Sequence, residues 1–461
     1  MTRREMMKRM AGAAAVAGFP TIIPSRVLGA DAPSNTVQVG QIGYGRIAES
    51  MDVRGIRATK GARIVAVADF DSKRLAVGKA AIEKFYADKG EAGEVKAFAN
   101  YQALIADKGV DAVSISTPDH WHSQPAVEAA FAGKDIFMQK PTSLTIDEGR
   151  LVSDAVRDNK RVFLLGSQQR SDEQFHRACE LVRNGRLGKI SLIQIGLPGD
   201  PPGGSTKEQP VPENLDYKAW LGSTPDVFYT EDRVHSQASI PSRPGWLRCE
   251  QFGAGMITGW GSHHLDIAHW AMGWEATGPK FIEDKGTKFN TGALWDVHGA
   301  YDVMLTYADN VQMRVWDKFP NGVRFIGEKG WIFVSRGAVK ATASDPVSSG
   351  GELKALDASD PALLAGDSGP VKLYRHRGNH HQNWIDCIKS RAETLVPVET
   401  AHRSCSACLL AHIGMKLNRK LEWDPAKERF VNDAEANAML TRTERAPYGT
   451  RHAYERLSKK A

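Results

Sequence analysis

Three short stretches of the sequence concentrate side chains that can take up, release or hold a proton. They are "STPDHWH" at 116–122, "QKP" at 139–141 and "HHLDIAH" at 263–269. Histidine, lysine and carboxylate side chains are the usual general acids and bases of enzymes. The first two stretches supply six polar groups: Thr117, Asp119, His120, His122, Gln139 and Lys140. Any one of them would pass for a loop residue, but six together favour a ligand-binding edge.

The third stretch also contains residue types that bind metal ions. His263, His264, Asp266 and His269 have donor atoms suited to zinc and similar metals. Residues 266–269 have the pattern of a helix beginning, where half of this cluster would point into packed side chains. Ligand-type residues on a packed helix are more often structural, so we expect no metal here.

A glycine turn follows the first apolar strand of the chain. "VQVGQIGYGRIA" at 37–48 alternates into a strand and ends in Gly43, Tyr44, Gly45, Arg46, Ile47 and Ala48, which fits G-x-G-x-x-A. The first glycine permits the tight turn, the second lets the backbone approach a pyrophosphate, and Ala48 allows close packing of the next helix. The second strand, "ARIVAVADFD" at 62–71, places Asp69 where it can bind ribose hydroxyls. Asp69 favours NAD, while Lys73 and Arg74 leave NADP open.

Strands and helices then alternate. Strands are expected in "VDAVSISTP" (110–118), "DIFMQKP" (135–141) and "RVFLLGSQQR" (161–170), and helices in "AVEAAFAGK", ended by Gly133, and over 146–159. This order predicts an α/β fold with a doubly wound parallel sheet of the Rossmann type. Its ligand should lie beyond the carboxyl ends of the strands, where the polar groups of the first two stretches stand.

The second half of the chain reads as a different kind of sheet. A strand at "KISLIQIGLP" (189–198) precedes a long Pro/Gly loop, and two hairpins follow, one about Asp309-Asn310 and one about residues 328–330. Successive hairpins predict an α+β domain with a large open, mostly antiparallel sheet. The span 341–370 is expected to be a surface insertion. We divide the chain into residues 1–30, 35–165 for the nucleotide domain and 166–461 for the substrate domain, whose C-terminal helices return to the core.

The amino terminus predicts export. "TRREMMKRMAGAAAVAG" at 2–18 has paired arginines before a weakly apolar segment, as in a twin-arginine signal peptide. Cleavage is expected after Ala30, with Ala32 as a competing end. The segment from Ala11 to Ile23 is too short to anchor the mature protein in a bilayer. We therefore expect a periplasmic or otherwise exported protein that uses the twin-arginine machinery.

Composition excludes other classes. The formal charge of +6 falls to +2 without residues 1–30, which carry five basic residues and one acidic residue, so nucleic acid is not expected as a partner. The five cysteines do not form an evident disulfide framework. Cys405 and Cys408 lie in an apparently helical run, where buried thiols are expected.

The order of glycine turn, "STPDHWH", "QKP" and "GWGSHHLDIAHW" resembles the Gfo/Idh/MocA oxidoreductases, the group of glucose-fructose oxidoreductase and inositol dehydrogenase. The resemblance extends to "FHRACELVRNGRLGKI" and the C-terminal "NWIDCIKS" and "HIGMKLNRKLEWDP", which are similar to the exported bacterial branch of the family. It implies a nicotinamide cofactor, NAD or NADP, and a homo-oligomer.

The resemblance also implies roles for single residues. The family usually has E-K-P where this chain has Gln139-Lys140-Pro141, so Lys140 should lie by the nicotinamide and the reacting hydroxyl. Pro141 should fix the turn, and a cis bond is one way to do so. The Asp-x-x-x-His motif of the family maps onto 259–263: His263 is the expected base, but Gly259 replaces the acid that would orient it, and His264 or Asp266 are its possible substitutes.

The remaining site residues are assigned from type and position. The cofactor set comprises Gly43, Tyr44, Gly45, Arg46, Ile47, Asp69, Thr117, Pro118, His120, His122, Gln139 and Lys140. Aromatic faces can stack on sugar rings, and the predicted substrate set comprises Arg170, Trp246, Trp260, His264 and Asp266. Trp270 and Trp274 are expected in the core.

Three functions fit these observations. The first is oxidation of a saccharide or polyol hydroxyl by a tightly held nicotinamide, loaded before export because twin-arginine transport carries folded proteins. The second is redox-neutral glycoside cleavage, in which transient oxidation acidifies a neighbouring C–H bond; Gln139 and Gly259 favour it. The third is sugar binding without catalysis.

Overall fold

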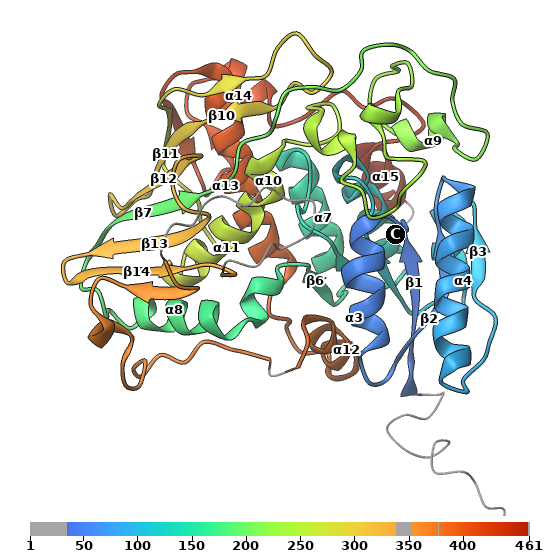
Figure 1. The fold of residues 1–461 in the computed structure, drawn as a ribbon, viewed down its shortest axis with the longest axis horizontal. Helices are drawn as coiled ribbons and strands as arrows, with labels where there is room; N and C mark the ends of the chain where they lie inside the picture. Colours follow the sequence, from blue (N-terminus) through green and yellow to red (C-terminus); the bar gives the residue numbers. More distant parts are fainter. Residues whose placement is uncertain (1–34, 338–352, 377, 460–461) are drawn as a thin grey trace, which may run out of the picture. The chain divides into compact units, whose positions relative to one another are not determined.

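The computed structural model describes residues 35–337, 353–376 and 378–459. The predicted signal peptide, residues 1–30, lies outside the described residues, as does part of the predicted insertion. Residues 37–461 form one unit by their internal contacts, and the two sheets described below both belong to it (Figure 1).

The first sheet is parallel and has six strands in the order β3-β2-β1-β4-β5-β6, so the prediction of a doubly wound Rossmann-type sheet is confirmed. Its strands are β1 (Val37–Ile42), β2 (Ala62–Ala68), β3 (Lys96–Phe98), β4 (Ala112–Ile115), β5 (Asp135–Met138) and β6 (Phe163–Leu165). The helices among them are η2 (Ala48–Asp52), α3 (Val53–Arg57), α4 (Ser72–Asp88), α5 (Tyr101–Ala106), α6 (Ser123–Phe131) and α7 (Ile146–Asp158).

Local signals in the sequence set the limits of these elements. The Thr145 side chain accepts a hydrogen bond from the Glu148 amide, and the Glu148 carboxylate accepts one from the Thr145 amide, which starts α7 with a capping box. Gly133 has a φ of +77° just past the end of α6, a conformation that favours glycine. The predicted helix boundaries therefore hold to within a few residues.

The second sheet has nine strands in the order β15-β14-β13-β7-β12-β11-β8-β16-β17. Only the neighbours β7 and β12 run parallel, so the prediction of a mostly antiparallel sheet is confirmed. The strands are β7 (Ile190–Gly196), β8 (Phe281–Asp284), β11 (Asp302–Thr306), β12 (Gln312–Trp316), β13 (Gly322–Gly327), β14 (Gly330–Val334), β15 (Leu356–Ala358), β16 (Leu421–Asp424) and β17 (Arg429–Phe430). β9 (Lys288–Phe289) and β10 (His298–Ala300) form a separate pair.

Part of the predicted insertion, 341–370, belongs to this sheet. Within its described residues β15 pairs with β14 and forms the edge of the sheet, and the 3₁₀ turn η7 (Pro361–Leu364) follows. A short strand without clear alternation gives no periodic signal, so the sequence pattern did not reveal it.

Helices pack against the second sheet and join it to the first. α13 (Val398–Leu417) contacts α7 and β6, which belong to the first half of the fold, and also α11 and β8 of the second. α8 (Glu173–Arg183) and α11 (Gly261–Met272) also contact this sheet, while α12 (His380–Ser390) reaches β5 and α15 (Thr450–Ser458) packs on α6. The other helical turns are η3 (Asp119–Trp121), η4 (Gln168–Ser171), α9 (Tyr217–Leu221), η5 (Glu231–Arg233), η6 (Gly245–Arg248), α10 (Met256–Gly259) and α14 (Ala434–Ala438).

The cysteines are buried and free. Cys405 and Cys408 lie within α13 as predicted, and burial raises the pKa of both thiols. Trp270 and Trp274 belong to the core of the second sheet, also as predicted. In the part of the chain that the structure describes, the helices fall short of the length and apolar character that crossing a bilayer requires.

Candidate active site

A crevice of about 1110 Å³ opens at the carboxyl ends of the parallel strands, where Rossmann sheets bind their ligands. Each central strand sends residues to its wall. From the predicted cofactor set these are Gly43, Gly45, Arg46, Ile47, Asp69, Thr117, Pro118, His122, Gln139 and Lys140. The structure therefore brings ten of the twelve predicted cofactor residues together around one cavity.

The glycine turn is shaped to let a ligand approach the backbone. Gly43 has a φ of +81°, and an added Cβ would lie 2.9 Å from the Ser116 carbonyl oxygen. At Gly45 an added Cβ would find its nearest neighbour, Arg74 Nη1, only at 3.9 Å. The first glycine is thus needed for the turn, and the second leaves open the space that a pyrophosphate would need. The turn fits a dinucleotide.

Asp69 stands at the end of β2 as predicted. Its Oδ2 accepts a hydrogen bond from the Tyr44 amide at 2.7 Å and its Oδ1 accepts one from the Asp71 amide at 2.9 Å. Burial raises the pKa of Asp69, while these amides and the Arg74 guanidinium oppose the rise. A carboxylate oriented in this way can accept hydrogen bonds from the ribose hydroxyls of a dinucleotide.

Two predicted cofactor residues do not line the crevice. The Tyr44 ring is buried against Gly78 of α4, where an added Cβ would lie 2.7 Å from the ring. His120 Nε2 lies 2.8 Å from the Trp220 carbonyl oxygen, and its ring packs between Trp220 and Phe252. Both side chains support the walls from behind, because each one finds its contacts inside the protein.

A second, smaller cavity of about 580 Å³ adjoins the crevice. Both cavities are lined by Arg46, Ile47, Gln139, Lys140 and Leu247, so they share a wall. The far wall of the smaller cavity comes from α10, α11 and the end of β14 and includes Gly259, Trp260, His263 and Arg336. The two predicted catalytic residues, Lys140 and His263, therefore line the same cavity although they are far apart in the sequence.

Lys140 is held at the border between the cavities. Its ammonium group donates a hydrogen bond of 2.8 Å to the Gly259 carbonyl oxygen, and the Lys140–Pro141 peptide bond is cis. The Gly259 position thus contributes a carbonyl oxygen here, where the family motif would have supplied a carboxylate. The acceptor beside the Lys140 ammonium group at this position is therefore an uncharged carbonyl oxygen.

His263 lies in the first turn of α11 and is buried. Burial, followed by the positive charges of Arg336 and Lys140, holds the pKa of His263 well below its usual range. Among the described residues, no hydrogen-bond partner faces its Nδ1. The imidazole is therefore neutral at physiological pH and able to accept a proton.

Gln139 belongs to a buried polar network behind Lys140. Its Nε2 donates to Asp52 Oδ1 at 2.8 Å, and Asp52 Oδ2 accepts a hydrogen bond from the Ser116 hydroxyl at 2.7 Å. His381 Nε2 lies 3.2 Å from the same Asp52 Oδ1. The carboxylate that the family places at position 139 is absent, but Asp52 supplies one from η2, directly beside the amide.

Asp119 is a titratable group of the crevice that the predicted catalytic and binding residues did not include. It lines the crevice at the start of η3 and is 4% exposed. Burial raises the pKa of Asp119 to about 7, against the pull of the Lys140 ammonium. The sequence predicted that Asp119 lies at the ligand-binding edge. It did not predict the burial of Asp119, which raises its pKa and results from the folding of distant segments around it.

The predicted substrate residues divide into two groups. Trp246 lines the crevice and Trp260 lines the smaller cavity. Arg170, Asp266 and His264, the other predicted substrate residues, line neither cavity. Arg170 forms two hydrogen bonds of 2.8 Å with Asp266 and is buried under α11, and His264 Nε2 lies 2.8 Å from Asn321 Oδ1. These three side chains help to fix α11 in place, because each makes a hydrogen bond within the protein.

Sequence reasoning also missed several lining residues. Arg243 and Arg336 line the smaller cavity, and His235, Ile240, Ser242 and Pro244 line the crevice. They come from loops and a strand end without recognisable motifs, so only their position in space marks them. Within the described residues, no group of three or more His, Cys, Asp or Glu side chains is arranged to hold a metal ion.

Comparison with known families agrees with this geometry. Residues 37–167 match the profile "Oxidoreductase family, NAD-binding Rossmann fold" of the Gfo/Idh/MocA group. Residues 203–336 and 370–450 match its companion, "Oxidoreductase family, C-terminal alpha/beta domain". The chain belongs to the Gfo/Idh/MocA oxidoreductase family. Its first sheet thus belongs to the NAD-binding domain of this family, and the glycine turn, Asp69 and Lys140 line the crevice of that domain.

Individual relatives are distant. The uncharacterized oxidoreductase YrbE of Bacillus subtilis is 26% identical over 67% of this chain and 75% of its own length. The myo-inositol 2-dehydrogenase of Thermotoga maritima is 29% identical over 39% of this chain, and the match spans 48% of that protein. The WlbA dehydrogenase of Bordetella pertussis, solved with NADH and UDP-GlcNAcA, has the same fold with a TM-score of 0.58 at 15% identity, over 84% of this chain and 99% of its own.

Proposed function

We propose that this protein oxidises a CH–OH group of a saccharide or polyol with NAD(P) as the hydride acceptor. One observation carries the proposal: Lys140 stands on the wall shared by the two cavities, and neutral His263 lines the smaller one. The crevice would hold the dinucleotide and the smaller cavity the substrate. Inositol dehydrogenases among the sequence relatives and the UDP-GlcNAcA complex among the fold relatives support a sugar or polyol as the substrate.

The residues of this chain would divide the work as follows. When bound, the nicotinamide supplies the acceptor for the hydride. His263, kept neutral by burial and by neighbouring positive charges, accepts the hydroxyl proton. The Lys140 ammonium stabilises the negative charge that develops on the substrate oxygen, while the Gly259 carbonyl keeps it in place. Trp260 would contribute apolar surface to the wall of the substrate cavity.

We propose further that the cofactor is retained between turnovers. Residues 234–247, which we name the covering segment, line the crevice through His235, Ile240, Ser242, Pro244, Trp246 and Leu247. This segment is bonded to the start of α4, a few residues after Asp69, which is expected to bind the ribose. Lys73 donates to the Gln237 carbonyl at 2.7 Å and Arg74 to the Ser236 carbonyl at 3.1 Å. The cofactor would therefore be enclosed by both halves of the chain.

Asp71 is the centre of this attachment. It accepts a hydrogen bond of 2.7 Å from Asn214, and its other oxygen lies 3.0 Å from His235 Nε2. Burial would raise the pKa of Asp71, but the bonds to His235 and Asn214 hold it well below its usual range. Release of the cofactor would require these buried bonds to break, which slows dissociation.

The function is tested with purified protein and a panel of saccharides and polyols followed by nicotinamide absorbance. We expect reduction of protein-bound cofactor by at least one of them, and loss of this signal in Lys140→Met. A protein that binds sugars but never reduces its cofactor would contradict the proposal and favour the sugar-binding alternative. Denaturation should release nicotinamide into the supernatant if the cofactor is retained.

Redox-neutral glycoside cleavage is the second candidate. It is favoured by Asp119, whose pKa of about 7 provides a further acid or base in the crevice beside Lys140. Elimination needs such a group to protonate the leaving oxygen, whereas plain oxidation does not. Deuterium from the solvent would appear next to the oxidised carbon only in this mechanism, so mass spectrometry of the product distinguishes the two.

We also propose export through the twin-arginine pathway, on the evidence of the paired arginines near the amino terminus. A folded protein would carry its cofactor from the cytoplasm, where the cofactor is made. Replacing both Arg3 and Arg4 by lysine should keep the protein in the cytoplasm. A homo-oligomer remains an expectation from the family, which light scattering would test.

A further inference from the structure

One buried carboxylate links four elements behind the wall that the two cavities share. Asp52 is the last residue of η2, and its side chain is fully buried. Its Oδ1 accepts a hydrogen bond of 2.8 Å from the Gln139 amide and lies 3.2 Å from His381 Nε2. Its Oδ2 accepts a hydrogen bond of 2.7 Å from the Ser116 hydroxyl. Residues of η2, of α12 and of the ends of β4 and β5 therefore meet at a single side chain.

The partners of Asp52 adjoin the site. Gln139 lines both cavities and precedes Lys140 in the sequence, and Ser116 lines the crevice and precedes Thr117. Asp52 itself follows the glycine turn, where the pyrophosphate of a dinucleotide is expected. Hydride transfer needs a defined separation of nicotinamide and hydroxyl, and a misplacement of about 1 Å can slow a reaction about 100-fold. The contacts of Asp52 therefore connect the expected cofactor turn to the lysine expected to act on the substrate.

The surroundings of Asp52 hold it in one orientation. The His381 ring packs against Phe137 of β5, with the ring centroids 4.5 Å apart. Gly55 of α3 lies so close to the same ring that an added Cβ would clash with it. A fully buried carboxylate with three hydrogen-bonding neighbours keeps its orientation, because turning away from them would leave it unsatisfied.

The charges of Asp52 and Lys140 act on the same neighbouring ring. His122 Nδ1 lies 2.6 Å from the Pro141 carbonyl oxygen and His122 Nε2 lies 2.9 Å from the Thr117 carbonyl oxygen, so this ring bridges the ends of β4 and β5. Burial lowers the pKa of His122 to about 4, and of the two charges the Lys140 ammonium acts in the same direction while the Asp52 carboxylate opposes it. The electrostatic influence of Asp52 therefore extends to the end of β5.

We propose that Asp52 is a positioning residue of the active site, which fixes the ends of β4 and β5 and keeps a negative charge near Lys140. The inference rests on the proposed function, in which the Lys140 ammonium stabilises the developing oxyanion. A negative charge close to an amine favours its charged form. Asp52 lines neither cavity, so it acts through Ser116 and Gln139 and touches neither cofactor nor substrate.

An exchange of two neighbouring side chains tests the proposal. Asp52→Asn keeps the shape of the side chain and removes its charge. The double variant Asp52→Asn/Gln139→Glu returns a carboxylate at the other end of the same hydrogen bond, with donor and acceptor exchanged. In single-turnover reduction of the bound cofactor, Asp52→Asn should be slowed about tenfold, while the dissociation constants of cofactor and substrate should change less than about twofold. The double variant should regain most of the rate.

An unchanged rate in Asp52→Asn, or a double variant no faster than the single one, would overturn the proposal. Ser116→Ala is a milder change, which removes one link and should slow the reaction about threefold. It carries the test if Asp52→Asn does not fold, and a native rate in Ser116→Ala would then count against the proposal.

The reactivity of the Lys140 amine shows the charge effect without turnover. The uncharged amine reacts with acetic anhydride, and mass spectrometry of the peptide gives the rate. At about pH 8, Asp52→Asn should label Lys140 about threefold faster than the native protein, and the double variant should return to the native rate. Asp119, His122 and His263, which also interact with the Lys140 charge, are the same in all these variants. Unchanged labelling in Asp52→Asn would overturn the proposal.

Asp135→Asn is the matched control. Asp135 is a buried carboxylate at the opposite end of β5, where it accepts hydrogen bonds from the Val162 amide and the Arg391 guanidinium. Its substitution should lower the thermal midpoint and leave both the reduction rate and the labelling of Lys140 unchanged. If no saccharide reduces the cofactor of the native protein, the proposed function fails while labelling still tests Asp52. If the native protein turns over and the Asp52 variants behave like it, the reverse holds.

Discussion

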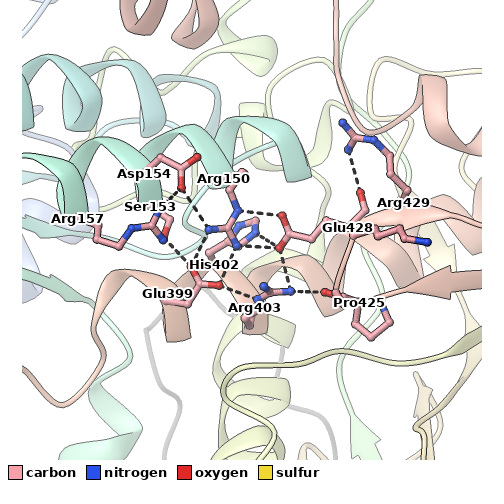
Figure 2. Close-up of polar contacts among 12 residues, drawn as sticks. Arg150, Ser153, Asp154, Arg157, Glu399, His402, Arg403, Pro425, Glu428 and Arg429 are labelled. Atoms are coloured by element: carbon pink, nitrogen blue, oxygen red, sulfur yellow. Dashed lines mark hydrogen bonds and ion pairs between the residues drawn. The ribbon is translucent and has the colours of Figure 1, made fainter. Parts of the chain in front are cut away.

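Two charged regions of this protein contain similar side chains and differ in how these are paired. At the junction of α7, α13 and β17, Arg150 donates hydrogen bonds of 2.8 Å to both oxygens of Glu399 and of 2.9 Å to both oxygens of Glu428 (Figure 2). Arg403 donates to Glu399, and His402 Nε2 lies 2.7 Å from Glu428. We call these five residues the Arg150 cluster.

In the Arg150 cluster each charge meets an opposite one. Burial would raise the pKa of Glu399, but hydrogen bonds from Arg150 and Ser153 lower it to about 2. The pKa of Glu428 is likewise held low by His402 and Arg150. The active-site cavities show the reverse, since burial raises the pKa of Asp119 to about 7 and lowers that of His263.

This difference distinguishes the Arg150 cluster, which has a structural role, from the cavities of the candidate active site. Carboxylates that are fully paired stay charged at all physiological pH values and fasten two halves of the fold. Asp119 and His263 are buried in the cavities and have displaced pKa values: that of Asp119 moves toward neutral pH, whereas that of His263 moves below its usual range and keeps the imidazole uncharged. Displaced pKa values, rather than the number of charges, mark the candidate reactive region.

The largest effect is expected from Lys140→Met. Loss of the ammonium group removes the stabilisation of the developing oxyanion, and cofactor reduction should slow by about 10³-fold. Single-turnover absorbance measures this rate. Retention of bound nicotinamide controls for folding, and a loss below about threefold would mean that Lys140 lies outside the chemistry.

Asp119→Asn should change stability in a pH-dependent way. The folded pKa of about 7 exceeds the usual value, so between about pH 4 and pH 7 the folded state binds more protons than the unfolded state and stability falls as pH rises. The variant lacks this penalty and should gain on the order of 3 kcal/mol relative to the native protein above pH 7, and little at pH 4. Urea unfolding at both pH values measures it.

Asp107→Asn is the matched control for this prediction. The pKa of Asp107 is lowered by the Lys96 ammonium and the Gly109 amide, so its substitution should cost stability at neutral pH and not at low pH. Parallel behaviour of the two variants would contradict the assignment of Asp119.

Arg150→Met tests the structural role of the Arg150 cluster. Removing the guanidinium leaves Glu399 and Glu428 without their shared partner and should destabilise the protein by about 2 kcal/mol at pH 7. Because both carboxyls have lowered pKa values, this difference should shrink as pH falls from about 4.5 toward 2. Cofactor reduction per folded molecule should stay unchanged; a large loss would mean that the cluster also shapes the site.

The smallest effect is expected from Lys84→Met. Lys84 pairs with Asp88 on the exposed face of α4, with side chains 75% and 61% exposed, where solvent screens the interaction. The thermal midpoint should not change measurably. A clear decrease would show that exposed pairing matters in this fold as much as the Arg150 cluster does.

Sequence patterns predicted the parts of the fold whose signals are local. The glycine turn at 43–48, the helix predicted over 146–159 and the hairpin at Asp309-Asn310 each depend on residues close together in the sequence, and the structure has all three. β15 went unpredicted because a three-residue edge strand has no periodicity. The domain boundaries, the signal peptide and the roles of the site residues stay predictions.

For the site, residue types were a weaker guide than position. Arg170 and Asp266 looked suited to a substrate, yet they satisfy each other beneath α11. Arg336 carried no motif and lines the cavity beside His263. A charged residue's function depends on whether its partner lies inside the protein. The sequence alone does not show which residues become partners when they are far apart along the chain.

The sequence by itself determined the parallel order of strand and helix, the dinucleotide turn and the lysine at the end of β5, because adjacent residues encode strands, turns and caps. Only the tertiary structure decided which cavity Lys140 and His263 share, which arginines line it, and that Asp119 titrates near neutral pH. These properties depend on burial and on charges brought close by folding, and electrostatic energy is set by distance in space and by exclusion of water.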